Sequence, residues 1–298
     1  MAGIRTPMVL VAGGLGSGKT TLLRRLIDAA DRRVAILMNE FGEVAIDSRI
    51  IEGRHIRMVE LTGGCVCCSL VGEFEAAVGE ILERARPDLI AVETTGVAEP
   101  DALILEVEDN LPRVRLDCVV LVADADVMVR FPHLGAVTRM QFESAHVVLL
   151  NKIDLVTPAD AQTAEVRIAG VNPAARLMRT VRCDIDPGLI FGMGSAGTVR
   201  SRPHPGRPSG PTPTSFTFLS PDPLDREAFE AFVEGLPAQI FRAKGFLRLG
   251  TEGFLFNYVA GRWDLEPFET EGNELVFIGH GADGVRESVI DSLRSYSA

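Results

Sequence analysis

Residues 8–30 read MVLVAGGLGSGKTTLLRRLIDAA, and this stretch decides the fold of the first part of the chain. The apolar run at 8–12 predicts a buried strand, and the helical pattern TLLRRLIDAA at 21–30 predicts a helix. Between them, GGLGSGKT at 13–20 matches G-x-x-x-x-G-K-[ST] at every defined position. A strand, a glycine-rich turn and a helix in this order predict a loop whose backbone N–H groups bind phosphate.

We call residues 13–20 the phosphate loop and assign roles to its side chains. Lys19 is expected to balance the charge of a terminal phosphate, and Thr20 to offer its hydroxyl to Mg²⁺. A glycine-rich turn that arose by chance is a poor alternative, because Lys19 and Thr20 both stand where the motif requires them. The residues predicted to bind nucleotide here are Gly13, Gly14, Leu15, Gly16, Ser17, Gly18, Lys19, Thr20 and Thr21.

Short apolar runs rich in β-branched residues alternate with helical patterns through the first two thirds of the chain. After 8–12 they lie at 34–38, 56–61, 89–93, 118–123 and 147–150. Continuous apolarity, without alternation, indicates strands that are covered on both faces. The sequence therefore predicts an α/β fold with a doubly wound, mostly parallel sheet.

A segment dense in Pro, Gly, Ser and Arg follows this pattern and predicts a linker. Beyond it, SFTFL, FLFNYVAG and ELVFIG predict strands, while PLDREAFEAFVEGL and VRESVIDSLRS predict helices. We therefore expect a first domain over 1–197, a linker over 198–214, and a small α+β domain over 215–298.

Composition limits the possible partners and the compartment. The formal net charge is -11, from 41 acidic and 30 basic residues, so the chain as a whole would repel nucleic acid and anionic lipid. No stretch of about 18 apolar residues is present, and we expect a cytoplasmic protein with neither a nucleic-acid nor a membrane partner. Two of the five cysteines, Cys118 and Cys183, stand apart and are expected to be small buried hydrophobes.

The stretch NKID, at the end of a predicted buried strand, is the candidate for recognition of the base. The carboxylate of Asp154 can accept hydrogen bonds from both N1–H and the amino group of guanine, which adenine cannot supply. Alone, this pattern with Asn151 and Lys152 is weak, because such residues also form solvated turns. After a phosphate loop and at the end of a strand, it is a strong indication of guanine recognition. Thr157 as a cap and Pro158 at the first helical position predict that a helix begins directly afterwards.

A third candidate segment, VETTG, closes another predicted core strand. Glu93 is our candidate ligand of Mg²⁺, directly or through water, and Gly96 our candidate for a backbone contact to the γ-phosphate. Asp124 and Glu99 stand at similar strand ends. For each of these two, a role beside the phosphates and plain loop capping are both open.

Three cysteines, Cys65, Cys67 and Cys68, fall within GGCVCC. A disulfide, a redox switch and a soft metal site are the alternatives; a reducing cytosol disfavours the disulfide. The cysteines directly precede a predicted helix, a position that lowers the thiol pKa and favours thiolate. Clustered thiolates suit Zn²⁺ first, followed by Co²⁺ or Cu⁺. Three protein sulfurs leave one coordination position open, which suits metal exchange.

The stretch MNEFGEVAID lies between the phosphate loop and these cysteines. Glu40, Glu43 and Asp47 could form a solvated acidic loop, but their position favours a switch segment that senses the γ-phosphate. Glu40 would then polarise water or supply a further metal ligand. The candidate catalytic residues are therefore Lys19, Glu40 and Glu93.

Together, GGLGSGKTTLL, NEFGEVAID, GGCVCCSL, ETTGVAEP, NKIDL, FRAKGFL and LVFIG resemble the CobW-type metallochaperone GTPases, relatives of the HypB and UreG nickel-insertion GTPases. The resemblance covers nearly the whole chain. It implies a GTPase domain that binds GTP, GDP and Mg²⁺, a CobW-type C-terminal domain, and delivery of a metal, most often zinc, to a client protein. It also implies that Asn151, Lys152 and Asp154 recognise guanine and that the three clustered cysteines bind the transferred metal.

One feature departs from the family pattern. Many members carry a histidine-rich run near the C-terminal domain, whereas this linker holds only His204, which argues against a large auxiliary metal store. Two other functions remain alternatives: a small-molecule P-loop kinase, which has no use for NKID, and a nucleotide-binding thiol redox or metal sensor. The client, the metal delivered in the cell and the oligomeric state stay open, and a homo-oligomer is allowed.

Overall fold

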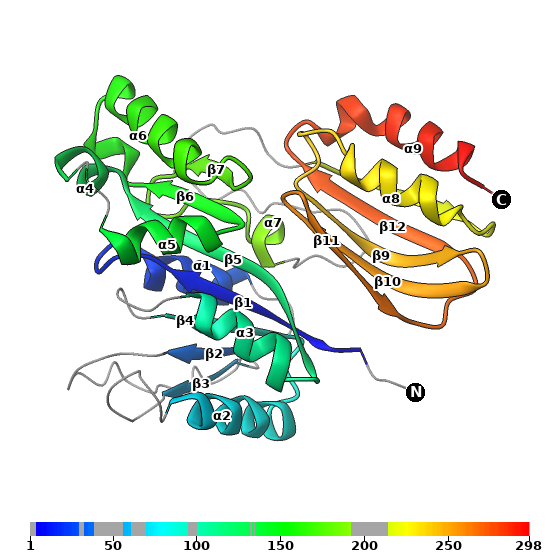
Figure 1. Ribbon diagram of the computed structural model, residues 1–298, viewed down its shortest axis with the longest axis horizontal. Coiled ribbons are helices and arrows are strands. Elements are labelled where there is room, and N and C mark those ends of the chain that lie inside the picture. Colours follow the sequence, from blue (N-terminus) through cyan, green and yellow to red (C-terminus); the bar gives the residue numbers. More distant parts are fainter. Residues whose placement is uncertain are drawn as a thin grey trace. The chain divides into compact units, whose positions relative to one another are not determined.

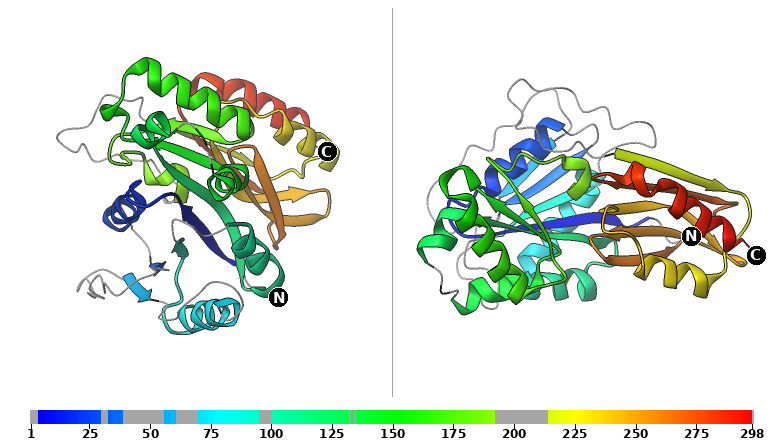
Figure 2. Two further views of the ribbon diagram at one scale, coloured as in Figure 1. Left: turned by 60° about the vertical axis from the view of Figure 1, so that its left-hand side comes forward. Right: turned by 90° about the horizontal axis from the view of Figure 1, so that it is seen from above.

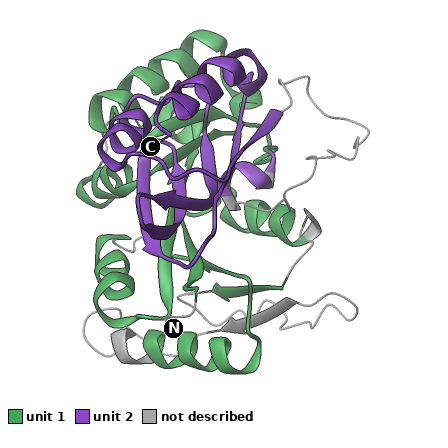
Figure 3. Cartoon of the chain, turned by 90° about the vertical axis from the view of Figure 1, so that its right-hand side faces the viewer, with its two compact units in different colours: residues 1–185 green, residues 186–298 purple. Residues whose placement is uncertain are grey.

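The computed structural model describes two compact units, residues 1–185 and 186–298, which are coloured separately in Figure 3. The described residues are 4–29, 33–38, 56–60, 70–94, 100–131, 133, 135–191 and 214–297. Almost all of the expected linker, 198–214, lies outside them, so the domain boundaries given above stay a prediction.

The first unit is built on a sheet whose described strands all pair in parallel, in the order β3-β2-β4-β1-β5-β6-β7 (Figure 1). This confirms the predicted doubly wound α/β class. The strands are β1 Thr6–Ala12, β2 Val34–Met38, β3 Ile56–Glu60, β4 Leu89–Glu93, β5 Val114–Asp124, β6 Val147–Asn151 and β7 Arg176–Arg179. Only β7 was not predicted: this edge strand reads RLMR and is partly exposed, so it lacks the continuous apolarity of the others.

Helices cover both faces of this sheet. On one face, Phe74 and Val78 of α2 and Val107 of α3 pack with Leu10 and Val92 of the sheet. Helices α4, α5 and α6 continue this layer over β5 and β6, while α1 lies on the other face (Figure 2). Their bounds are α1 Lys19–Ala29, α2 Leu70–Arg84, α3 Pro100–Asn110, α4 Ala125–Arg130, α5 Ala136–Ser144, the 3₁₀ turn η1 Ile153–Leu155 and α6 Pro158–Val171.

The order of the strands creates one special point in the sheet. Strands β1 and β4 are neighbours, but the helices that follow them, α1 and α3, lie on opposite faces. In open α/β sheets such a reversal leaves a crevice at the carboxyl ends of the two strands, and ligands bind there. The phosphate loop follows β1 and Glu93 ends β4, so both predicted segments meet at this point.

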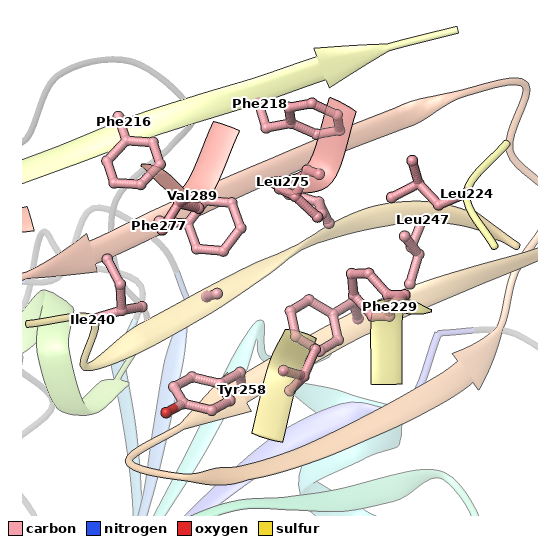
Figure 4. Close-up of a cluster of buried hydrophobic side chains, with 14 of the residues drawn as sticks. Phe216, Phe218, Leu224, Phe229, Ile240, Leu247, Tyr258, Leu275, Phe277 and Val289 are labelled. Atoms are coloured by element: carbon pink, nitrogen blue, oxygen red, sulfur yellow. The ribbon is translucent and has the colours of Figure 1, made fainter. Parts of the chain in front are cut away.

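In its described residues, the second unit holds a five-stranded antiparallel sheet in the order β11-β10-β9-β12-β8, with α8 and α9 on one face (Figure 1). Its core is aromatic: Phe216 stacks on Phe277 at 5.1 Å between ring centroids (Figure 4). Phe229 meets Phe256 edge-on at 5.2 Å. The elements are α7 Pro187–Phe191, β8 Thr214–Ser220, α8 Arg226–Glu234, β9 Arg242–Leu249, β10 Glu252–Val259, β11 Arg262–Pro267, β12 Asn273–Gly279, the 3₁₀ turn η2 Ala282–Val285 and α9 Arg286–Ser295.

The predicted small α+β unit is thus confirmed, with two additional strands. Strands β9 and β11 were not predicted, because charged residues interrupt their apolar pattern (RAKGFLRL and RWDLEP). Across the described part of both units, no helix combines the length and the apolar composition needed to span a membrane.

Candidate nucleotide-binding site

The phosphate loop joins β1 to α1 and depends on its glycines. Gly13 and Gly18 have φ of +140° and +120°, a region that L side chains rarely adopt. A Cβ on Gly13 would lie 2.3 Å from the carbonyl oxygen of Val122, and a Cβ on Gly18 would lie 2.6 Å from Nδ2 of Asn151. Both the backbone conformation and the available space therefore require glycine at these two positions.

Two polar side chains of this loop fit a bound phosphate. Lys19 is only 7% exposed, and its ammonium donates to the carbonyl oxygens of Gly13 at 3.0 Å and Gly14 at 3.3 Å. A charged phosphate oxygen is a stronger acceptor for an ammonium than a neutral carbonyl, so an anion can take over these bonds. Ser17 is 2% exposed, and its Oγ has no hydrogen-bond partner among the described residues. A buried hydroxyl is costly to leave unpaired, and a phosphate oxygen would satisfy it.

A hydroxyl and a carboxylate converge beside Lys19. Thr20, in the first turn of α1, donates from Oγ1 to the two carboxylate oxygens of Glu93 at 3.3 and 3.4 Å. Glu93 is 6% exposed, and its Oε1 lies 4.0 Å from Nζ of Lys19. Oxygen ligands of this kind suit Mg²⁺, so the residues present fit the expected ion. The roles of Thr20 and Glu93 as magnesium ligands stay predictions.

Asn151, at the end of β6, links the phosphate loop to a second loop. Its Nδ2 donates to the backbone carbonyl of Ser17 at 2.8 Å. Its Oδ1 accepts from Oγ1 of Thr180 at 3.1 Å and from the backbone N–H of Cys183 at 2.8 Å. We call residues 180–184, which follow β7, the base loop. One buried amide, 2% exposed, thus connects the expected phosphate and base ends of the site.

The rest of NKID is arranged around Asp124. Lys152 is left-handed, with φ of +62°, and its Nζ pairs with Oδ2 of Asp124 at 2.6 Å. The other carboxylate oxygen of Asp124 accepts from the backbone N–H groups of Asp126 and Val127, which caps α4. Of the two interpretations left open for Asp124, loop capping is therefore the one that the structure shows. Asp154 lies in η1 with an exposed side chain.

The predicted helix start after NKID is confirmed. Helix α6 begins at Pro158, and Oγ1 of Thr157 accepts from the backbone N–H of Asp160 at 3.2 Å. This cap satisfies one of the N–H groups that a helix start leaves unpaired. The helix therefore begins a short distance after Asp154.

Both isolated cysteines are buried, as predicted, but Cys183 also contributes to the site. Burial raises the pKa of its thiol to about 12, against the weaker opposing effect of the positive charges of Arg25 and Lys152. Its Sγ lies 3.4 Å from the carbonyl oxygen of Gly18. The protonated thiol is therefore a neutral packing group next to the phosphate loop.

Sequence reasoning missed the base loop. Thr180 and Cys183 contact Asn151, and Arg25 of α1 contacts Arg182 and Asp184. No sequence signal marks this loop, because it follows the weak strand β7 and turns without Gly, Asn or Pro.

Several predicted residues lie outside the described part of the chain. These are Glu40, Glu43, Asp47, Cys65, Cys67, Cys68, Gly96, Glu99 and His204. Among the described residues, no group of three or more His, Cys, Asp or Glu side chains is placed to hold a metal ion. The assignments of the clustered cysteines to a transferred metal, and of Glu40 and Gly96 to catalysis and the γ-phosphate, therefore stay predictions.

Comparison with known families matches both parts of the chain. Residues 7–179 match the CobW/HypB/UreG nucleotide-binding domain, and residues 214–296 match the cobalamin synthesis protein CobW C-terminal domain. The zinc chaperone YjiA of Escherichia coli is 33% identical over 193 residues, which cover 62% of this chain and 60% of YjiA. The zinc-regulated GTPase metalloprotein activator 1 of Dictyostelium discoideum is 25% identical over an alignment that covers 97% of this chain and 78% of the length of that protein.

Other similar proteins belong to the same group. The zinc chaperone CobW of Pseudomonas aeruginosa is 31% identical over 63% of this chain and 60% of its own. Among solved structures, Zn(II)-bound YjiA GTPase from E. coli aligns over 100% of both chains, with 23% identity and a TM-score of 0.48. With its nucleotide-binding domain followed by a CobW C-terminal domain, this chain belongs to the CobW/HypB/UreG family.

Proposed function

We propose that this chain is a GTP-hydrolysing metallochaperone that binds zinc and transfers it to a metal-dependent client protein. Relatives that are named zinc chaperones and a zinc-regulated GTPase support the proposal. The observation that carries its nucleotide part is the buried amide of Asn151, which joins the phosphate loop to the base loop. Such a link is useful to a protein that must recognise the base and the phosphates of one nucleotide together.

Guanine is the base that this arrangement favours. The exposed carboxylate of Asp154 lies three residues after Asn151 and can accept both N1–H and the amino group of guanine. Lys152, held by Asp124, supports the same segment. A small-molecule kinase has no need of this carboxylate, so GTP and GDP are the nucleotides we propose.

The side chains of the phosphate loop would act on the β–γ bond by position and charge. Lys19 would exchange its two carbonyl partners for phosphate oxygens. Ser17 would donate to one of these oxygens its hydroxyl, which has no partner among the described residues. When bound, Mg²⁺ neutralises charge on the phosphate oxygens. Thr20 and Glu93 are the residues that would hold this ion. Glu40 for the attacking water and Gly96 for the γ-phosphate complete the proposal from the sequence.

The metal part of the proposal rests on Cys65, Cys67 and Cys68. Their place in the sequence, between the segment with Glu40 and the segment with Gly96, allows the γ-phosphate to order the thiolates. Hydrolysis would then loosen the site and release zinc, or cobalt in its place, to a client through the open coordination position. A cytoplasmic location and a homo-oligomer stay predictions from the sequence.

The decisive experiment measures zinc affinity by competition with a chromophoric chelator in three states: with Mg²⁺ and a non-hydrolysable GTP analogue, with GDP, and without nucleotide. We expect the analogue to tighten zinc binding by about 5- to 150-fold, a coupling of about 1–3 kcal/mol, and zinc to tighten analogue binding equally. A variant with alanine at Cys65, Cys67 and Cys68 is the control, and should lose both effects. Equal zinc affinity in the three states would refute GTP-gated transfer.

A further inference from the structure

The base loop contains a turn of an unusual kind. Arg182 and Cys183 have φ of +53° and +52°, and the backbone N–H of Asp184 donates to the carbonyl oxygen of Val181 at 3.0 Å. Positive φ at both central residues with this hydrogen bond is the pattern of a type I′ turn, which normally requires Asn-Gly or a similar pair. Here neither central residue is Gly, Asn or Asp, so the turn is strained.

This strain lies directly beside the nucleotide site. The backbone N–H of Cys183 reaches Oδ1 of Asn151 only because the turn holds it there, and Nδ2 of Asn151 in turn holds the carbonyl of Ser17. If the turn relaxed to negative φ, the Cys183 N–H would point elsewhere and Asn151 would lose one of its partners. Strained backbone persists only where surrounding contacts over-determine it.

Arg25 supplies those contacts from α1. Its Nε donates to the carbonyl oxygen of Arg182 at 2.9 Å, and its Nη1 pairs with Oδ1 of Asp184 at 2.8 Å. The planar guanidinium fork thus contacts the turn at two of its four residues, a geometry that a lysine cannot reproduce. The side chains of Arg25 and Asp184 are 36% and 21% exposed.

We infer that Arg25 is a positioning residue of the nucleotide site, which holds the turn 181–184 in its left-handed form and so keeps Asn151 aligned between the phosphate loop and the base loop. The inference rests on the proposed function, because it requires Asn151 to lie beside the bound guanine nucleotide. In this arrangement α1 positions the phosphate end of the site through Lys19 and Thr20, and the base end through Arg25.

The chain offers a matched control for the loss of this arginine. Arg33 also binds one aspartate, Asp88, through two guanidinium nitrogens, Nε at 3.3 Å and Nη2 at 2.9 Å. It stands immediately before β2, at the end of the parallel sheet opposite to the phosphate loop. Arg33→Ala therefore removes a comparable surface ion pair of the same unit without touching the nucleotide site.

The experiment measures dissociation constants of fluorescent GDP, IDP and ADP analogues for wild type, Arg25→Ala, Arg33→Ala, Arg182→Asn and the double variant Arg25→Ala/Arg182→Asn. We expect Arg25→Ala to weaken GDP binding about tenfold or more and to lower the preference for GDP over IDP, with Arg33→Ala within about twofold of wild type. Arg182→Asn replaces an exposed side chain by one that tolerates positive φ, so it should restore much of the loss in the double variant.

Each failure has a distinct meaning. A wild-type protein that binds ADP as tightly as GDP would overturn the proposed function itself. A wild type that prefers GDP, with Arg25→Ala no weaker than Arg33→Ala, would overturn the role of Arg25 alone. A double variant as weak as Arg25→Ala would show that Arg25 acts by charge and does not position the turn. If Arg25→Ala does not fold, Asp184→Asn gives the same comparison. This variant keeps the hydrogen bond from Arg25 to the carbonyl oxygen of Arg182, so the expected loss of GDP affinity is smaller.

Discussion

Replacing Asn151 by alanine tests the central link of the site. The substitution leaves three groups without their partner: the carbonyl of Ser17, the hydroxyl of Thr180 and the backbone N–H of Cys183. Each lost hydrogen bond lowers the free energy of unfolding by about 0.5–1.5 kcal/mol, so the loss of all three should lower it by about 3 kcal/mol. The substitution also removes the link between the phosphate loop and the base loop. Nucleotide affinity should therefore fall by much more than the loss of stability alone would cause.

A second buried asparagine provides the control. Asn172 donates from Nδ2 to the carbonyls of Phe142, Glu143 and Ala145, and its Oδ1 accepts from two further backbone N–H groups. Asn172→Ala should therefore destabilise the protein at least as much as Asn151→Ala, because Asn172 makes more hydrogen bonds. It should leave nucleotide affinity near the wild-type value, since none of its partners belongs to the site.

The assay combines urea unfolding, followed by circular dichroism, with fluorescence titration of a labelled GDP analogue below the unfolding transition. We expect both variants to lose about 3 kcal/mol or more of stability, and only Asn151→Ala to lose at least about 30-fold in GDP affinity. Equal nucleotide affinity in the two variants, or a stability loss below about 1 kcal/mol for Asn151→Ala, would refute the proposed link.

Three further predictions concern single side chains. Asp154→Asn removes the carboxylate that accepts two donors of guanine, so nucleotide preference should shift from GTP toward XTP in a competition assay; an unchanged preference would contradict the base assignment. With Co²⁺ as a probe, wild type and Cys118→Ala should show intense thiolate-to-metal absorption and Cys67→Ala should not; equal loss in both variants would exclude the cluster. The pKa of Cys183 is raised from 9.0 to about 12, so the folded state keeps a proton that the unfolded state releases, and stability should fall as pH rises from about 9 toward 12. Cys183→Ala should flatten this part of the urea-unfolding profile, and an identical slope in both proteins would contradict the assignment.

Much of the fold could be predicted because local patterns and tertiary structure agree. The strands β1, β2, β4, β5 and β6 are buried, and their continuous apolarity directly reflects cover on both faces. Thr157 and Pro158 predicted the start of α6 for a similarly local reason, since a helix end needs a partner for its free N–H groups. Strands β7, β9 and β11 escaped prediction because partial exposure allows charged residues in them.

The sequence by itself predicted the residues of the candidate site: the phosphate loop, Glu93 and the NKID residues are all proposed from residue types at fixed spacing. Only the tertiary structure decided how they are joined. The bridge from Ser17 through Asn151 to Cys183 spans residues that are distant in the sequence, and the clamp of Arg25 on Asp184 crosses 159 positions. The physical reason is that a motif consists of residues close together in the sequence, whose types follow from the local backbone geometry. These contacts instead depend on parallel strands, which bring their carboxyl ends to one edge of the sheet. A left-handed turn without glycine leaves no mark in the sequence, because the contacts that hold it come from a helix far away along the chain.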